Sequence, residues 1–238
     1  MVRSGRTGIY SMKQPSTAKP YLGLTPHPPD ATRDAMEIAK RGMLPLVEVF
    51  YSLQGEGLRT GQATVFVRFA GCNCDCWFCD TDFRVRESVA IDTLLETIAD
   101  IGGDCRWVCL TGGEPTIHDL APLCGKLHDC GYRIQVETNG SRPRPSWELD
   151  HITVSPKVHE GARLDPWYFK NATEFKHVID DQYDIELATD LAAKHDKSLY
   201  LQPNSHNPAA ATLCIDAVKR EPHRFRLSLQ THKLLSIP

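Results

Sequence analysis

The chain has no long apolar run and no excess of basic over acidic residues, and its number of cysteines is odd. No segment approaches the roughly 20 apolar residues of a membrane-spanning helix, and the first residues, MVRSGRTGIYSMK, lack the apolar stretch of a secretory signal. The 30 acidic residues outnumber the 27 lysines and arginines, which gives a net charge of −3. The basic face typical of nucleic-acid-binding proteins is therefore not expected. These features predict a cytoplasmic protein that binds neither a membrane nor a nucleic acid.

Cysteine, by contrast, is abundant. Nine cysteines occur in 238 residues, and four of them lie within the eight residues CNCDCWFC. An odd total does not suit a complete disulfide framework. In a reducing compartment, clustered cysteines are more often metal ligands than disulfide partners. The sequence therefore predicts a metal centre in this short segment.

Residues 1–42 differ in composition from the rest of the chain. Proline and glycine are frequent up to Pro29, and only Asp30–Lys40 carries a short helical pattern. We predict a partly flexible N-terminal extension here, with a packed N-terminal arm as the equal alternative. The globular pattern begins near Met43, an alternative start, so residues 43–238 are predicted to form the core domain.

Apolar, β-branched runs alternate with helical patterns through the remainder of the chain. This alternation predicts parallel strands joined by right-handed crossovers, and hence an α/β fold. An open or incomplete barrel with helices outside is the expected architecture, and a doubly wound sheet is the alternative. The predicted strands are Leu46–Tyr51, Thr64–Phe69, Trp107–Leu110, Tyr132–Glu137, His151–Val154, Ala172–Ile179, Ser198–Gln202 and Phe225–Gln230.

Four helices are expected between these strands. The first would be capped by Ser88 and end at Gly102, and the second would end at Gly131. Asp184–His195 is the third, and Ala209–Lys219 is the fourth, with an asparagine–proline pair directly before it.

The cysteine cluster contains the spacing CxxxCxxC, formed by Cys72, Cys76 and Cys79 directly after a predicted strand. Sites of α/β proteins lie at this carboxyl edge of the sheet. Three thiolates on a short loop can hold three irons of a cubane and leave the fourth iron open, which is a catalytic arrangement. Cys74 would point to the opposite side of an extended loop. Zinc is the alternative metal, although structural zinc usually draws on two separated cysteine pairs.

CxxxCxxC after a first strand, followed one crossover later by TGGEP at Thr111–Pro115, resembles the radical S-adenosylmethionine (SAM) enzymes. Within that superfamily the chain closely resembles the 7-carboxy-7-deazaguanine synthase family. The resemblance covers residues 46–238. It rests on FYSLQGEGLRTGQATVFVRFAGCN at Phe50–Asn73 and on CDT, TGGEP, ETNG, VSPK, LQPN and QTHK in order. Cys74, at a position where the family commonly has leucine, and the long N-terminal segment depart from the pattern.

The resemblance implies a partial TIM-like barrel and a radical SAM lyase. The reaction would convert 6-carboxy-5,6,7,8-tetrahydropterin to 7-carboxy-7-deazaguanine with loss of ammonia, in the biosynthesis of queuosine and other 7-deazapurines. Implied cofactors are a [4Fe–4S] cluster, SAM and Mg²⁺, and implied partners are a second copy of the chain and a flavodoxin-like reductant. Two alternatives remain. One is an activating enzyme that places a radical on a partner protein, and the other is a non-catalytic zinc or iron–sulfur scaffold.

The resemblance also implies how the cofactors are held. Cys72, Cys76 and Cys79 would bind the cluster, and the hydroxyl of Thr81 would bind Mg²⁺, which prefers oxygen ligands. Without the resemblance these segments have simpler interpretations. DTD would be a capping or turn motif, VSPK would be the end of a strand, and LQPN would be the start of a loop. No general acid or base is assigned, because the cluster and SAM generate the radical. The implied SAM-binding residues are Gly113, Ser155, Pro156, Lys157, Gln202, Pro203, Asn204 and Ser205.

The pterin substrate carries a carboxylate and an edge of donors and acceptors. Arg68 can form paired hydrogen bonds with a carboxylate, and strand alternation places it on the face opposite Val67 and Phe69. Each of these residues also has an alternative role. Arg68 could form a surface salt bridge, and QGEG could be a solvated turn. His232 could be a histidine of the core. The implied substrate-binding residues are Leu53, Gln54, Gly55, Glu56, Arg68, Thr111, His232 and the C-terminal Pro238.

Overall fold

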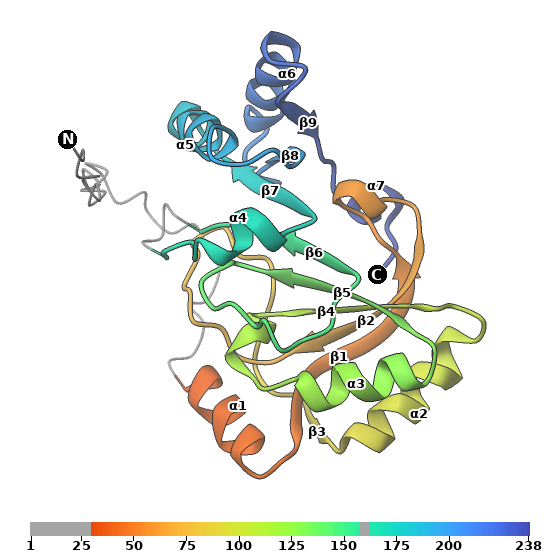
Figure 1. The fold of residues 1–238 in the computed structure, drawn as a ribbon. Coiled ribbons are helices and arrows are strands. Elements are labelled where there is room, and N and C mark those ends of the chain that lie inside the picture. Colours follow the sequence, from red (N-terminus) through yellow and green to blue (C-terminus); the bar gives the residue numbers. More distant parts are fainter. Residues whose placement is uncertain (1–29, 158–161) are drawn as a thin grey trace, which may run out of the picture.

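The computed structural model describes residues 30–157 and 162–238. Within these ranges nine strands form one sheet in the order β3-β1-β2-β4-β5-β6-β7-β8-β9. The sheet is curved and carries helices on its outer side (Figure 1). The strands are β1 Leu44–Leu53, β2 Ala63–Phe69, β3 Glu87–Val89, β4 Trp107–Gly112, β5 Arg133–Thr138, β6 His151–Val154, β7 Glu174–Ile179, β8 Leu199–Pro203 and β9 Phe225–Leu227.

Each predicted strand is present, and β3 was not predicted. From β2 to β9 all neighbours pair in parallel, as expected. The first two strands are an exception, because β1 runs antiparallel to β2 and to β3. The connection from Leu53 to Ala63 is too short for a parallel crossover, which needs a dozen or more residues. The prediction of parallel strands throughout was therefore wrong at this edge.

The helices in the described ranges are α1 Ala31–Lys40, α2 Ile91–Gly102, α3 Ala121–Asp129, α4 Trp167–Asn171, α5 Gln182–Ala192, α6 Ala210–Arg220 and α7 Thr231–Leu235, with 3₁₀ turns η1 Gly57–Arg59 and η2 Pro115–Ile117. The predicted helices lie close to α1, α2, α3, α5 and α6, whereas α4 and α7 were not predicted. The predicted helix at Asp30–Lys40 is thus confirmed as α1, whereas residues 1–29 lie outside the described part of the chain. Ser88 does not cap α2. It lies in β3 opposite Pro45, because the edge of β1 takes this segment into the sheet.

The hydrophobic core lies between the sheet and its outer helices. From β2, Val65, Val67 and Phe69 are fully buried in it, while Phe66 and Arg68 turn to the inner face, as strand alternation predicts. Ile98 of α2 packs in the same core. The order of the strands starts at β3 and ends at β9 without closing, so the fold is a partial barrel.

No helix in the described ranges is both long enough and apolar enough to cross a membrane.

Candidate active site on the inner face of the sheet

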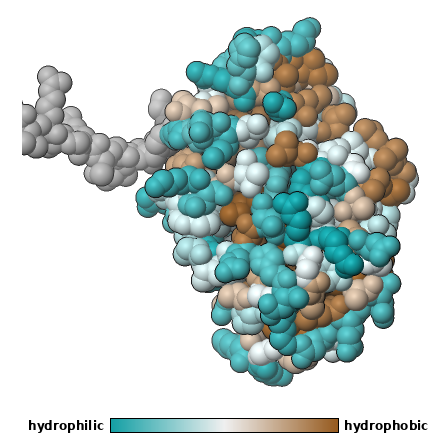
Figure 2. All heavy atoms as spheres, turned by 45° about the vertical axis from the view of Figure 1, so that its right-hand side comes forward, coloured by the Kyte–Doolittle hydropathy of each residue, from teal (hydrophilic) through white to brown (hydrophobic). Residues whose placement is uncertain are grey.

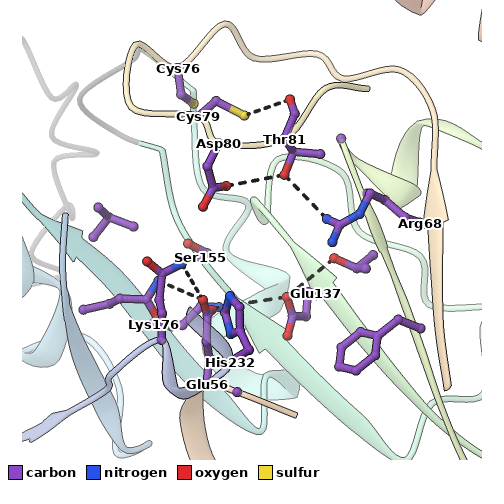
Figure 3. A pocket seen from close by; sticks show the side chains of 18 of the residues that line it. Glu56, Arg68, Cys76, Cys79, Asp80, Thr81, Glu137, Ser155, Lys176 and His232 are labelled. Carbon is purple, nitrogen blue, oxygen red and sulfur yellow. Dashed lines mark hydrogen bonds and ion pairs between the residues drawn. The ribbon is translucent and has the colours of Figure 1, made fainter. Parts of the chain in front are cut away.

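A cavity of about 650 Å³ lies on the inner face of the sheet. It has a lower level of side chains from the strands and an upper level of loops at their carboxyl ends (Figure 3). Every residue assigned from the sequence to the cluster, Mg²⁺, SAM or the substrate lines this cavity, except Pro156. Pro156 is buried beside it, in the turn that follows β6. One space therefore brings together motifs that are up to 185 residues apart, from Leu53 to Pro238.

The upper level contains the loop between β2 and β3, which carries the cysteines. Cys72, Cys76 and Cys79 all line the cavity, and the N–H of Cys74 donates to Cys72 Sγ at 3.4 Å. The hydrogen bond with the Cys74 thiol and burial raise the pKa of Cys72, and burial raises the pKa of Cys79. Without a bound cation these thiols therefore stay protonated, and iron would have to displace their protons.

Cys74 lines the cavity too, and Asn139 Nδ2 donates to its sulfur at 3.4 Å. The contact with Cys72 alone would lower the pKa of Cys74, but its contact with Cys76 and burial raise that pKa to about 11. Among the described residues no three histidine, cysteine or acidic side chains form a group that could hold a single metal ion. A cubane makes a different demand, because each of its cysteines binds a separate iron.

The TGGEP segment packs directly beneath the cysteine loop. A Cβ atom at Gly113 would lie 2.1 Å from Gly71 O, and the N–H of Glu114 donates to that same oxygen at 2.9 Å. Glycine is thus required at position 113 by the neighbouring main chain itself. This contact fixes the cysteine loop against the end of β4.

Glu114 links TGGEP to ETNG. Its carboxylate is 1% exposed and accepts hydrogen bonds from Thr116 N at 3.0 Å and Thr138 Oγ1 at 2.7 Å. The N–H of Asn139 donates to its other oxygen at 2.6 Å. These hydrogen bonds join the buried Glu114 to both Thr138 and Asn139 of ETNG. The two motifs therefore act as one rigid support for the upper level of the cavity.

The lower level is built around Lys176 of β7. Its ammonium forms an ion pair with Glu56 and lies 3.9 Å from Glu137 Oε2 (Figure 3). Burial alone would lower the pKa of Lys176, but the two carboxylates raise it well above its usual value. Burial alone would raise the pKa of Glu56, but Lys176 and the side chain of Gln230 hold it below the usual range. The lysine is therefore charged, and it is shared by two carboxylates.

Three glutamine side chains extend this lower level. Gln54 Nε2 donates to Glu137 at 2.9 Å, while Gln202 and Gln230 donate to Glu56 at 3.2 Å and 2.8 Å. Because two acidic groups share one lysine, the floor of the cavity carries net negative charge and many amide groups. Such a surface suits a flat, N–H-rich ligand.

Arg68 reaches the cavity from β2 and also forms an ion pair. Its Nε lies 2.7 Å from Glu48 Oε1, and its Nη1 lies 3.5 Å from Thr81 Oγ1. The Thr81 hydroxyl is in turn 3.5 Å from Asp80 Oδ1 (Figure 3). Arg68 therefore also forms the salt bridge that was predicted as its alternative role. The ion pair with Glu48 uses Nε, so the remaining N–H groups of the guanidinium are left for the cavity that Arg68 lines.

The C-terminal tail crosses the cavity. Both the N–H and the hydroxyl of Thr231 donate to Gly55 O at 3.0 Å, and His232 covers Gly55 so closely that a Cβ there would lie 2.1 Å from its Nδ1. The hydroxyl of Ser52 donates to the main-chain oxygen of Pro238 at 2.8 Å. The end of the chain is thus held at the carboxyl end of β1, as part of the cavity wall.

The loops after β6 and β8 complete the upper level. Lys157 Nζ donates to Ser155 O at 2.9 Å and to Ser155 Oγ at 2.6 Å, which fixes this turn. Asn204 Nδ2 donates to Asp180 at 3.0 Å, so its amide is used to hold the loop after β8. Both loops present main-chain and side-chain polar groups to the cavity.

Comparison with known proteins shows the family. The family model described as the radical SAM superfamily matches residues 66–153. A 7-carboxy-7-deazaguanine synthase of Bacteroides thetaiotaomicron is 42% identical over 190 residues, which cover 80% of this chain and 96% of that protein. The enzyme of the same name from Burkholderia multivorans is 39% identical over 214 residues, covering 80% and 97%.

A solved structure agrees with these relatives. The crystal structure of QueE from Escherichia coli matches with a TM-score of 0.69 and 30% identity, and it covers 82% of this chain and 97% of that one. The chain belongs to the 7-carboxy-7-deazaguanine synthase family. It is therefore a radical SAM enzyme, and its superfamily uses a [4Fe–4S] cluster and SAM. The cavity fits both groups, since its upper level contains the three thiols of CxxxCxxC beside TGGEP.

Several residues of the cavity were not predicted. Lys176 of β7 and Glu137 of β5 line the cavity, and so do Gln230 and Lys233, which come from the tail. A lysine within the buried run EFKHVI was the available signal, because lysine is rarely buried unless it is paired. Glu137 begins ETNG, which the resemblance contains but to which no role was given.

Proposed function

We propose that this protein converts 6-carboxy-5,6,7,8-tetrahydropterin into 7-carboxy-7-deazaguanine with loss of ammonia, a step toward queuosine and other 7-deazapurines. The observation that supports this most is the two-level cavity. Its upper level has the residues expected for a cluster and SAM, and its lower level has a negatively charged, amide-rich floor. The family of the relatives and the chemistry of the cavity thus lead to the same substrate class.

Cys72, Cys76 and Cys79 are proposed to hold the [4Fe–4S] cluster. The TGGEP segment with Gly113, the turn Ser155–Lys157 and the loop Gln202–Ser205 are proposed to surround SAM. When bound, the reduced cluster and SAM supply a 5′-deoxyadenosyl radical. The contribution of the chain is to orient SAM and to exclude water from the cavity.

The pterin is proposed to lie on the lower level. Its guanidine-like edge has N–H groups that match the carboxylates of Glu56 and Glu137, and the charge of those carboxylates exceeds that of Lys176. The substrate carboxylate is proposed to bind the free N–H groups of Arg68. Leu53, Gln54, Gly55, Thr111, His232 and the terminal Pro238 are proposed to complete the pocket.

Thr81 is proposed to bind Mg²⁺. Its hydroxyl lines the cavity 3.5 Å from a carboxylate oxygen of Asp80, so two oxygens of the kind that Mg²⁺ prefers lie together. The lysine of α7, Lys233, forms an ion pair with Asp80. Mg²⁺ held here would polarise oxygen atoms of the substrate.

A homodimer and a flavodoxin-like reductant are the proposed macromolecular partners. Large apolar side chains stay exposed in the C-terminal part of the chain. Leu234 is 71% and Leu235 is 62% exposed, and Leu229 is 43% exposed. Hydrophobic surface gathers toward the upper right of the molecule in Figure 2. Exposed apolar groups of this kind favour contact with another protein.

One anaerobic reaction tests the proposed function. Reconstituted, reduced protein is mixed with SAM, Mg²⁺ and carboxytetrahydropterin, and the products are read by mass spectrometry. A product lighter than the pterin by one ammonia is expected, without an equivalent amount of 5′-deoxyadenosine, because loss of ammonia alone balances the conversion. Deoxyadenosine with unchanged pterin would contradict the proposal and would favour an activating enzyme that acts on a protein.

A further inference from the structure

Helix α1 lies against the cysteine loop, although it precedes residues 66–153, which match the radical SAM superfamily. The hydroxyl of Thr32 donates to Cys72 O at 2.7 Å and accepts from Cys72 N at 3.1 Å. One side chain thus binds both main-chain polar groups of the first cysteine of CxxxCxxC. A hydroxyl has one donor, so its donor is fully used here.

The packing of α1 supports the same contact. Ala31 and Ala35 are 4% and 0% exposed, so the face of α1 that carries them is buried. A Cβ at Gly71 would lie 3.1 Å from Ala35 Cβ and 3.4 Å from Thr32 Cα. Gly71 has a φ of +83°, a conformation that favours glycine. The helix therefore approaches the loop at a residue without a side chain.

Gly71 is also held from its other side. Its carbonyl accepts from Glu114 N at 2.9 Å, and its N–H donates to Phe83 O at 2.9 Å. The base of the cysteine loop is thus enclosed by TGGEP, by the return of the loop and by α1. Through Thr32, α1 contacts Cys72 itself.

We propose that α1 is part of the cluster site and that Thr32 is a positioning residue for Cys72. The inference rests on the proposed assignment of Cys72 as a cluster ligand. Thr32 fixes the main chain of Cys72, and the direction of its thiol follows from that main chain. Residues that orient metal ligands in this way affect metal retention by about 10–100-fold.

The test compares iron retention among variants of the full-length protein. Thr32→Val keeps the shape of the side chain and removes both hydrogen bonds, whereas Thr32→Ser keeps the hydroxyl. Thr212→Val makes the same change at an exposed threonine in the first turn of α6. Each protein is reconstituted anaerobically, and the loss of cluster absorbance to a ferrous chelator is followed. Circular dichroism of the metal-free proteins checks that they fold.

Iron release from Thr32→Val is expected to be about tenfold faster than from the unchanged protein. Thr32→Ser and Thr212→Val are expected to release iron at the unchanged rate. Equal rates for Thr32→Val and Thr212→Val would overturn the inference. So would equal, fast release from both Thr32 variants, because serine retains the two hydrogen bonds.

Cys72→Ala separates this inference from the proposed function. Loss of the cluster in Cys72→Ala with normal retention in Thr32→Val would reject the role of Thr32 and leave the ligand assignment standing. A stable, complete cluster in Cys72→Ala would reject the ligand assignment, and the inference with it.

Discussion

The ammonium of Lys176 and the carboxylate of Glu56 form a buried ion pair in the floor of the cavity, joining β7 to the connection after β1. Their side chains are 7% and 12% exposed. The two residues are 120 positions apart in the chain. This pair therefore links the two halves of the partial barrel beneath the proposed substrate.

Replacing Lys176 by methionine should destabilise the fold. The change leaves Glu56 and Glu137 without the cation between them, and breaking one side of a buried pair costs about 3 kcal/mol. Urea unfolding of the metal-free protein measures this loss. The double variant Lys176→Met/Glu56→Gln should regain part of it, because one of the uncompensated charges is gone. An unchanged midpoint for Lys176→Met would contradict the described pair.

The same pair predicts a dependence of stability on pH. The pKa of Glu56 in the folded protein is below its ordinary value of 4.5. A carboxyl shifted downward stabilises the fold above its unfolded pKa and loses that contribution as the pH falls through its folded pKa.

The difference in unfolding free energy between the unchanged protein and Glu56→Gln should therefore be constant near neutral pH. It should shrink as the pH falls below about 4.5. Urea unfolding at a series of pH values measures it, and a difference that grows toward acid would show that the pKa is raised instead.

Arg68→Lys tests the proposed contact with the substrate carboxylate. Lysine keeps the charge beside Glu48 but cannot form paired hydrogen bonds. Loss of a charged hydrogen bond of about 1.5–3 kcal/mol should lower kcat/KM by about 10- to 100-fold. Formation of deoxyadenosine without the pterin should not change.

Glu48→Gln is the matched control for Arg68, since Glu48 is half exposed and pairs with the same guanidinium. It should change kcat/KM by less than about fivefold, because exposed pairs contribute about 1 kcal/mol or less. A larger loss of kcat/KM in Glu48→Gln than in Arg68→Lys would contradict the assignment of Arg68 to the substrate carboxylate.

One alanine added after Pro238 should impair the enzyme. The terminal residue is held by Ser52 in the cavity wall, and an added residue converts its carboxylate to a neutral amide. Loss of one charged contact should lower kcat/KM by about tenfold. An alanine inserted after Met1 is the control for chain length. Full activity of the C-terminally extended protein would contradict the proposed role of Pro238 in substrate binding.

Much of the fold could be predicted because its strands are short apolar, β-branched runs separated by helical patterns. The side of the sheet that Arg68 faces followed from the alternation along β2. The errors occurred where distant partners decide the structure. Ser88 has the chemistry of a helix cap, but the edge of β1 recruits it into β3. The antiparallel pairing of β1 was also missed, because the strands and helices that follow it alternate as in an all-parallel sheet.

The cysteines of the site could be predicted, because the spacing CxxxCxxC is typical of one kind of metal centre. In the lower level Gln54 and Glu56 were assigned, but Lys176 was not, because it matters only through Glu56 and Glu137, which lie far away in sequence. The contact of Thr32 with Cys72 is hidden for the same reason. No local pattern reports which side chain will meet a distant loop.

A crystal structure of the reconstituted protein with SAM and the pterin tests the central claim, that cluster, SAM and substrate share one cavity. A cluster bound by Cys72, Cys76 and Cys79 is expected. The pterin edge is expected to lie against Glu56 and Glu137, with the pterin carboxylate on Arg68. A pterin bound outside this cavity, or a cluster held by other ligands, would contradict the proposed function of the cavity.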